Sequence, residues 1–392
     1  MKSRNAVALA VIAVVATMGA VGTGAAGTRA ATSPPTSDPP VTEVAAPEVA
    51  AGSTLPATET VAADTDWEKV VPGGDCACAD GSEFNFWVRE ADPAKVVLYL
   101  EGGGACFDPT TCAFEDSSPY DWNISPDDDP SLMSGIFDFA NPQNPFADYS
   151  FVHVPYCTGD VHLGDRTREY APDLTVEHVG MVNGTAALSY LAENFADAAQ
   201  VVVVGRSAGA VASPLYGGLV SDVVPDAQVT VYADGAGAYP DEPGINTVVG
   251  ELWGTFANVP DWDVNEGLAA EDWGAAQLWV QAGLHDPEIV MSRFDHAYDE
   301  VQTSFMDLLG LDTSDVGASM AAREAEIEAA GVVQHSFTAP GTEHTLVRDD
   351  PFYAMEVNGI VLSEWVGDVV AGDDVADVVC TECGDPAPPT TG

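Results

Sequence analysis

A short segment with a central serine has the residue types that covalent catalysis needs. Residues 205–209 read Gly-Arg-Ser-Ala-Gly and follow four consecutive valines. Between a strand and a helix, a Gly-x-Ser-x-Gly segment forms a sharp turn that holds the serine in a strained and exposed position, because larger side chains at the glycines would collide with their neighbours. Small-residue corners also occur without catalysis. The segment therefore predicts that Ser207 is a nucleophile if the chain also supplies a base, an acid and an oxyanion hole.

The base has to be a histidine, which in this type of fold follows both the serine and the acid in the chain. The histidines downstream of Ser207 are His285, His296, His335 and His344. His335 lies within the run VVQHSFT, which is typical of a strand. His344 lies in the loop that leaves this run and precedes the last predicted helix. Such a loop should project over the sheet edge, so we predict that His344 is the base.

Two aspartates compete for the role of the acid that orients this histidine. Asp234 ends the predicted strand QVTVYAD, and Asp299 follows the next strand region, which also contains Asp286 and Asp295. In parallel sheets, sites gather at the carboxyl ends of strands. Both candidates satisfy this condition, so position alone leaves Asp234 and Asp299 open.

The sequence also offers backbone N–H groups for an oxyanion hole. One donor is expected from the residue after the nucleophile, Ala208, and the other from a glycine-rich loop after an earlier strand. The segment LEGGGAC places Gly102, Gly103 and Gly104 directly after the predicted strand KVVLYLE. Three glycines before a cysteine that is expected to form a disulfide favour this role over a merely flexible turn.

The elements that must position these residues alternate along the chain. Near-continuous apolar runs predict strands covered on both faces, beginning at Lys95, Tyr149, Gln200, Gln228, Gln277, Glu288 and Val332. Helical patterns lie between several of them, at residues 184–195, 208–220 and 351–370. This alternation predicts an α/β fold with a mainly parallel sheet and helices on both faces.

The charge of the chain excludes whole classes of partner. It has 62 acidic residues against 12 basic ones, which gives a formal net charge of −50. Such a protein repels nucleic acid and anionic membrane surfaces, so neither is an expected partner. The excess of carboxylates is interpreted as a means of keeping an exported protein hydrated.

The two ends of the chain differ in composition from its middle. Residues 1–31 combine a basic start, an apolar run and small residues, which is the layout of a secretory signal peptide. Residues 32–66 and 384–392, rich in Pro, Thr and Ala, are predicted to be a disordered tether and tail. We therefore expect a secreted protein with a single domain over residues 67–383.

Seven cysteines in an exported chain predict disulfides, and the odd number leaves one thiol without a partner in the chain. Cys106 and Cys112 are close enough to close a small loop. Cys380 and Cys383 have the spacing of half a zinc site, but no second pair matches them, so a terminal disulfide is favoured.

A further segment resembles part of a calcium-binding loop. Asp261-x-Asp263-x-Asn265 opens like a calcium loop, but the glycine and glutamate that complete such a loop are missing. It is interpreted as a solvated acidic loop. The sequence thus predicts neither a metal nor a cofactor.

Five segments, in this order, resemble the pectin acetylesterase and Notum family of extracellular carboxylesterases, and most closely its bacterial branch. They are LYLEGGGAC, VPYCTGDVHLGD, GRSAGA, AYDEVQ and GTEHTLV. The resemblance covers most of residues 74–370. It implies an α/β-hydrolase-like fold and a metal-free Ser-Asp-His triad.

Carried over position by position, the resemblance implies that Ser207 is the nucleophile and His344 the base. It implies Asp299 as the acid, because the family aspartate also lies three residues before a glutamine. Gly103, Gly104 and Ala208 match the oxyanion backbone. Many relatives carry an aromatic residue beside these glycines, where this chain has Ala105, which puts the acyl preference in doubt.

The resemblance also implies two disulfides. Cys78 and Cys157 resemble one bridged pair of the family, and Cys106 and Cys112 resemble another. Cys76, Cys380 and Cys383 match no family cysteine, so their pairing stays open.

The sequence therefore predicts a secreted serine carboxylesterase that acts on an acylated carbohydrate or another small ester. An acetyl ester of a polysaccharide is the first expectation by family analogy, although a net charge of −50 fits poorly with a polyanionic pectin. Two alternatives stay open. One is a deacylase for long acyl chains of lipids or lipidated proteins, as in the Notum branch. The other is a secreted binding protein that keeps the scaffold without catalysis.

Overall fold

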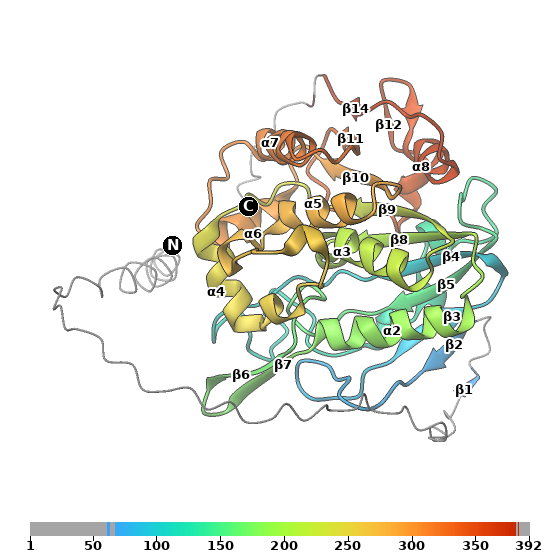
Figure 1. The fold of residues 1–392 in the computed structure, drawn as a ribbon. Coiled ribbons are helices and arrows are strands. Elements are labelled where there is room, and N and C mark those ends of the chain that lie inside the picture. Colours follow the sequence, from blue (N-terminus) through green and yellow to red (C-terminus); the bar gives the residue numbers. More distant parts are fainter. Residues whose placement is uncertain (1–60, 63–66, 382, 384–392) are drawn as a thin grey trace, which may run out of the picture. The chain divides into compact units, whose positions relative to one another are not determined.

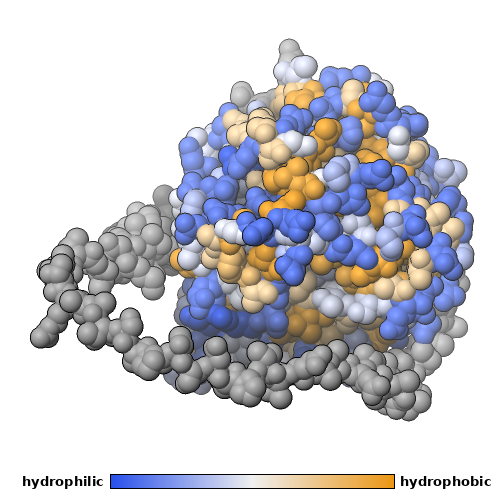
Figure 2. All heavy atoms as spheres, in the orientation of Figure 1, coloured by the Kyte–Doolittle hydropathy of each residue, from blue (hydrophilic) through white to orange (hydrophobic). Residues whose placement is uncertain are grey.

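The structure is a computed structural model of the 392-residue chain, and it describes residues 61–62, 67–381 and 383. The predicted signal peptide and tail lie outside the described residues, as does almost all of the predicted tether. Among the described helices, none has both the length and the hydropathy that a membrane crossing needs. On the face seen in Figure 2, hydrophilic side chains cover much of the surface, with apolar ones between them.

A ten-stranded sheet is the framework of the described residues (Figure 1). In spatial order its strands are β1 (Val61–Ala62), β2 (Trp67–Val70), β3 (Phe86–Arg89), β5 (Tyr149–Val154), β4 (Asp92–Leu100), β8 (Gln200–Arg206), β9 (Gln228–Asp234), β10 (Val290–His296), β11 (Gln334–Ala339) and β14 (Val378–Val379). Neighbouring strands from β5 to β14 are parallel, whereas β1, β2 and β3 join one edge in antiparallel pairs. The predicted mainly parallel sheet is confirmed.

Helices cover both faces of this sheet (Figure 1). One face packs against α2 (Gly180–Asn194), α3 (Ala208–Val223), α5 (Ala275–His285) and α7 (Val316–Ala329), and the other against α8 (Leu362–Ala371). Two more helices, α4 (Pro243–Trp253) and α6 (Glu300–Leu308), follow the carboxyl ends of β9 and β10. Two hairpins complete the fold: β6 (Arg166–Ala171) with β7 (Leu174–His178), and β12 (Glu356–Val357) with β13 (Ile360–Val361).

The central strands are apolar at consecutive positions because each face has its own helical layer. Leu98 of β4 and Val203 of β8 belong to the core beneath α3 and α5, whereas Val97 and Val202 belong to the core beneath α8. Side chains alternate between the two faces of a strand, so a strand buried on both sides needs an apolar residue at every position. This explains the valine run that leads to Ser207.

One predicted strand is wrong. The run that begins at Gln277 lies within the helix α5, whose buried positions include Ala276, Trp279 and Gly283. These are three and four residues apart, which is the helical period. A run of five mostly apolar residues is too short to separate a buried strand from a buried helix. The other six predicted strands form β4, β5, β8, β9, β10 and β11.

The last predicted helix is only partly right. Residues 351–370 do not form one helix, since α8 begins at Leu362. Before it, Asn358 and Gly359 adopt positive φ angles of 55° and 84° and connect β12 to β13. Asn-Gly is the preferred pair for such two-residue hairpin turns. The Asn358-Gly359 pair therefore indicates a turn within residues 351–370, where the sequence pattern had predicted a helix.

Three disulfides are present: Cys78–Cys157, Cys106–Cys112 and Cys380–Cys383. The first two are the pairs implied by the family resemblance, and the third is the terminal disulfide favoured by the spacing. Cys76 is unpaired within the described residues and is half-buried. Several disulfides in one chain are typical of an exported protein.

Removing the Cys78–Cys157 disulfide by alanine at both positions is expected to lower the free energy of unfolding by about 2–5 kcal/mol. The bridge spans 79 residues of chain and so restricts the unfolded state strongly. Urea unfolding of the oxidised proteins measures the loss. The matched control is the double alanine variant of Cys106–Cys112, which spans 6 residues and should lose less. A larger loss in this control would contradict the argument.

Candidate active site

Ser207 lies at a strained turn between β8 and α3. Its φ of 51° and ψ of −113° place a non-glycine residue in a sparsely populated region, which costs about 1–3 kcal/mol. The Ser207 N–H donates to the Asp234 carbonyl oxygen at 2.8 Å, which fixes the turn to β9. A Cβ atom on Gly205 would lie 2.3 Å from the Gly209 carbonyl oxygen, and one on Gly209 would lie 2.0 Å from the Leu100 carbonyl oxygen. Both glycines of the segment are therefore required.

The structure brings Ser207, His344 and Asp299 together. Ser207 Oγ lies 2.7 Å from His344 Nε2, and His344 Nδ1 lies 2.7 Å from Asp299 Oδ2. The Asp299 side chain is fully buried, whereas that of His344 is 15% exposed. With its proton on Nδ1, His344 donates to Asp299 and accepts from the Ser207 hydroxyl. This arrangement permits general-base activation of a serine.

Asp299 is held by the start of α6, where it is the N-cap residue. Its Oδ1 accepts the N–H groups of Val301 and Gln302 at 2.9 Å each. Its Oδ2 also accepts the Gln302 side-chain amide at 2.9 Å. That amide donates to Asp295 as well, at 2.9 Å. In the sequence, Gln302 served only to identify Asp299 as the family aspartate. In the structure, the Gln302 side chain orients the Asp299 carboxylate.

Asp234, the alternative acid, has a different position. Its buried Oδ2 accepts the N–H groups of Leu346 and Val347 at 2.9 and 2.7 Å, so it holds the loop that follows His344. Burial raises its pKa to about 7, against the effect of these hydrogen bonds. The carboxylate that bonds His344 is that of Asp299.

The glycine loop packs directly against the serine turn. A Cβ atom on Gly102 would lie 2.6 Å from Ser207 Cβ, and one on Gly104, whose φ is 74°, would lie 1.9 Å from the Pro119 carbonyl oxygen. Ala208 is the first residue of α3, and the first N–H groups of a helix have no acceptor within the helix. Gly104 and Ala208 line the same cavity as Ser207, so part of the glycine loop lies beside the serine at the positive end of a helix.

A largely apolar cavity of about 150 Å³ opens beside Ser207. Its walls include Ile245, Val249 and Trp253 of α4 and Phe305 of α6. A second cavity of about 110 Å³ shares the three α4 residues with it and continues toward α5. An apolar cavity of about 150 Å³ is large enough to hold benzene. The space beside Ser207 therefore exceeds what an acetyl group fills.

Many relatives carry an aromatic residue beside the glycines, where this chain has Ala105. In this structure another element, α6, supplies an aromatic ring at that place. The Phe305 ring comes within 3.2 Å of the place where a Cβ atom on Gly104 would lie. An aromatic ring supplied by α6 therefore lies beside the glycines that are predicted to form the oxyanion hole. Because Phe305 is far from these glycines in sequence, only the tertiary fold shows this substitution.

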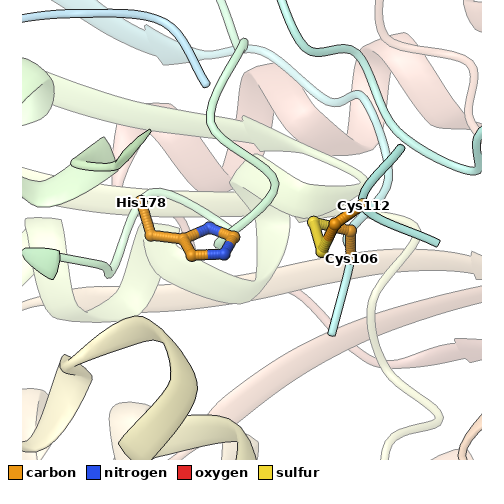
Figure 3. A group of neighbouring side chains, drawn as sticks. All are labelled: Cys106, Cys112 and His178. Carbon is orange, nitrogen blue, oxygen red and sulfur yellow. A yellow bond between two sulfur atoms is a disulfide. The ribbon is translucent and has the colours of Figure 1, made fainter. Parts of the chain in front are cut away.

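One cluster of metal-ligand side chains is present in the described part of the chain. Cys106, Cys112 and His178 bring possible ligand atoms within 4.8 Å of one another (Figure 3). However, the two sulfurs form a disulfide, His178 Nδ1 bonds the Thr158 carbonyl at 2.8 Å, and Nε2 lies 2.9 Å from the Tyr170 hydroxyl. Burial lowers the pKa of His178 to about 4. We interpret this cluster as structural.

Comparisons with known proteins agree with this architecture. The family model "Pectinacetylesterase" matches residues 69–260. Palmitoleoyl-protein carboxylesterase NOTUM of Schmidtea mediterranea is 31% identical over 97 residues, which cover 22% of this chain and 18% of that protein. The match thus spans less than a fifth of that relative's length.

The fold is also similar to that of a solved structure. The Wnt deacylase Notum from Drosophila superposes with a TM-score of 0.57 at 16% identity, covering 81% of this chain and 96% of that chain. The predicted α/β-hydrolase-like fold is confirmed, whereas the place in a bacterial branch stays a prediction. Residues 69–260 thus form a pectinacetylesterase domain, and the chain is a homologue of the Notum carboxylesterases by sequence and by structure.

Proposed function

We propose that the protein is a serine carboxylesterase that prefers acyl chains longer than acetyl. The observation that carries this proposal is the Ser207–His344 pair at the mouth of an apolar cavity. Ser207 Oγ attacks the ester carbonyl carbon while its proton passes to His344 Nε2, and Asp299 stabilises the charged imidazole. The backbone N–H groups of Gly103, Gly104 and Ala208 stabilise the oxyanion.

The acyl-enzyme is then hydrolysed at the same groups. The alcohol leaves with the proton held by His344, and a water molecule takes its place. His344 accepts a proton from this water, whose oxygen attacks the acyl carbonyl carbon. Collapse of the second oxyanion breaks the bond to Ser207 Oγ, which recovers its proton, and the carboxylic acid is released.

The size of the cavity favours longer acyl chains over the acetyl group expected first. An acetyl group would leave most of the cavity unfilled, whereas each further buried methylene contributes about 0.8 kcal/mol. The name of the Schmidtea relative, a palmitoleoyl-protein carboxylesterase, also denotes an acyl chain longer than acetyl. A net charge of −50 argues against a polyanionic pectin as the alcohol part. We therefore place the natural substrate among acylated lipids, peptides or neutral carbohydrates.

A series of p-nitrophenyl esters from acetate to decanoate tests the proposal. We expect kcat/KM to rise by up to about fourfold for each methylene until the cavity is full. If no ester of the series were hydrolysed, the esterase assignment would be overturned. If acetate were the best substrate, the preference for longer chains would be wrong and the acetylesterase would be the better interpretation.

A narrower cavity beside Ser207 should reverse the preference for longer acyl chains. Val249 of α4 lines both cavities, so Val249→Trp is expected to lower kcat/KM for the octanoate ester by at least about tenfold, the equivalent of two methylenes. The acetate ester should be hydrolysed almost as before. Thr247→Trp, at an exposed position of the same helix, is the matched control. An equal loss on both esters would contradict the acyl role of this cavity.

A further inference from the structure

Arg206, which precedes Ser207, bonds two other loops of the site. Its Nε donates to Thr345 Oγ1 at 2.9 Å, and its Nη1 lies 3.4 Å from Glu101 Oε1. Thr345 follows His344 directly, and Glu101 directly precedes the three glycines. One side chain thus connects the residues next to the nucleophile, next to the base and next to the oxyanion loop.

Two further contacts fix the same loop. Arg348 Nη1 donates to Glu101 Oε1 at 2.9 Å, so Glu101 binds two guanidinium groups. Asp234 accepts the N–H groups of Leu346 and Val347, as described above. We call the five side chains that make these contacts the clamp: Glu101, Arg206, Asp234, Thr345 and Arg348. The clamp ties residues 345–348 to the carboxyl ends of β4, β8 and β9.

The charge of Glu101 makes the clamp sensitive to the loss of either arginine. The Glu101 side chain is only 2% exposed, and a buried carboxylate needs paired charges. His153 Nε2 lies 3.9 Å from its other oxygen. Burial lowers the pKa of His153 to about 3, so this imidazole is neutral and leaves compensation to Arg206 and Arg348. Removing Arg206 would leave one guanidinium for this carboxylate.

We infer that the clamp holds the His344 loop in bonding distance of Ser207, and that Arg206 and Thr345 are positioning residues for the reaction. This inference rests on the proposed function. Residues 340–349 contain no helix or strand, so individual hydrogen bonds hold this loop. Backbone bonds hold Gly341, Thr342 and Val347. Next to His344 itself, the Thr345 side chain is held by Arg206. A displacement of about 1 Å in a catalytic group can lower the rate about 100-fold.

Thr345→Val tests this with the least disturbance, because it removes the hydroxyl that accepts from Arg206 and keeps the shape of the side chain. We expect kcat for the octanoate ester to fall about 10- to 100-fold. KM should change little, since the described residues that line the acyl cavity do not include Thr345 or Arg206. Thr345→Ser, which keeps the hydroxyl, should restore most of kcat. Arg206→Met combined with Thr345→Val should lose no more than Arg206→Met alone, because the two residues act through one bond.

Thr230→Val is the matched control. Thr230 is a buried residue of β9, and its hydroxyl has no partner in the described part of the chain, so this variant should keep its kcat. Hydrogen exchange gives a second readout that needs no activity. The peptide that contains residues 345–348 should exchange faster in Arg206→Met and in Thr345→Val than in the wild type.

The outcomes separate the inference from the proposed function. If the wild type hydrolyses esters and Thr345→Val keeps full kcat, the clamp inference is wrong and the esterase stands. Equal losses in Thr345→Val and Thr230→Val would also overturn it. If the wild type hydrolyses no ester, the proposed function fails, and unchanged exchange over residues 345–348 would then overturn the clamp as well. Should Arg206→Met not fold, Thr345→Val decides alone.

Discussion

Replacing Ser207 by alanine is expected to lower kcat for p-nitrophenyl esters by at least about four orders of magnitude. In the proposed mechanism Ser207 Oγ is the atom that forms the acyl-enzyme, and the other triad members cannot act without it. His344 Nε2 lies 2.7 Å from this oxygen and would face an inert methyl group in the variant. Turnover of the octanoate ester by the two purified proteins measures the effect.

The same substitution should leave the fold intact. The alanine keeps the backbone hydrogen bonds of the turn, including the one from residue 207 to the Asp234 carbonyl oxygen. We therefore expect a thermal unfolding midpoint close to that of the wild type. A fluorophosphonate probe, which reacts with activated serines, should label the wild type and not Ser207→Ala. Equal turnover by the two proteins would end this mechanism. Equal rates at the uncatalysed background would favour a non-catalytic binding protein on this scaffold.

The serine turn could be predicted because its chemistry is local. Gly205 and Gly209 are required by contacts within the β8–α3 unit and with the neighbouring strand β4, and both elements carry clear patterns of their own. The chain order of nucleophile, acid and base narrowed the base to a loop after the last long strand. The parallel sheet followed from strands buried on both faces.

The parts that could not be predicted depend on contacts between distant elements. Asp234 and Asp299 both end or follow strands, so position along the chain left the acid open and only the family resemblance implied Asp299. The position of α6 shows that the Asp299 carboxylate reaches His344. The acyl cavity arises between α4 and α6, and neither helix carries a sequence signal for it. Arg206 is the only charged residue of the serine segment 205–209. Its partners Thr345 and Glu101 are 139 and 105 residues away, so no local pattern could assign it a role.

The two wrong predictions, a strand at Gln277 and a single helix over residues 351–370, also have physical causes. The run at Gln277 is too short for its periodicity to be measured, and helical burial at Ala276, Trp279 and Gly283 decides its state. Neither error touches the site, because α5 and the β12–β13 hairpin bear none of its reactive groups. The elements that carry Ser207, His344 and the glycines were placed correctly from the sequence.

Asp299→Asn is expected to lower kcat about 10⁴-fold, which is the second largest effect after that of Ser207→Ala. Asparagine can accept or donate at the position of Oδ2, so it no longer fixes the proton of His344 on Nδ1, and it offers no charge to stabilise the imidazolium. The stability of the variant should change little, since asparagine caps the start of α6 as well as aspartate does. The loss would therefore reflect the reaction and not unfolding, which a thermal melt of the variant checks.

Asp234→Asn is the matched comparison, because it makes the same change at the other candidate acid. Its amide oxygen can still accept from Leu346 and Val347, and an amide resembles the protonated carboxyl that a pKa of about 7 already allows near neutral pH. We expect a far smaller loss of kcat than in Asp299→Asn. If Asp234→Asn alone lost activity, Asp234 would be the acid, and the bond between Asp299 and His344 would have another purpose. If both variants lost it equally, the hold of Asp234 on the loop that follows His344 would matter as much as the charge of Asp299.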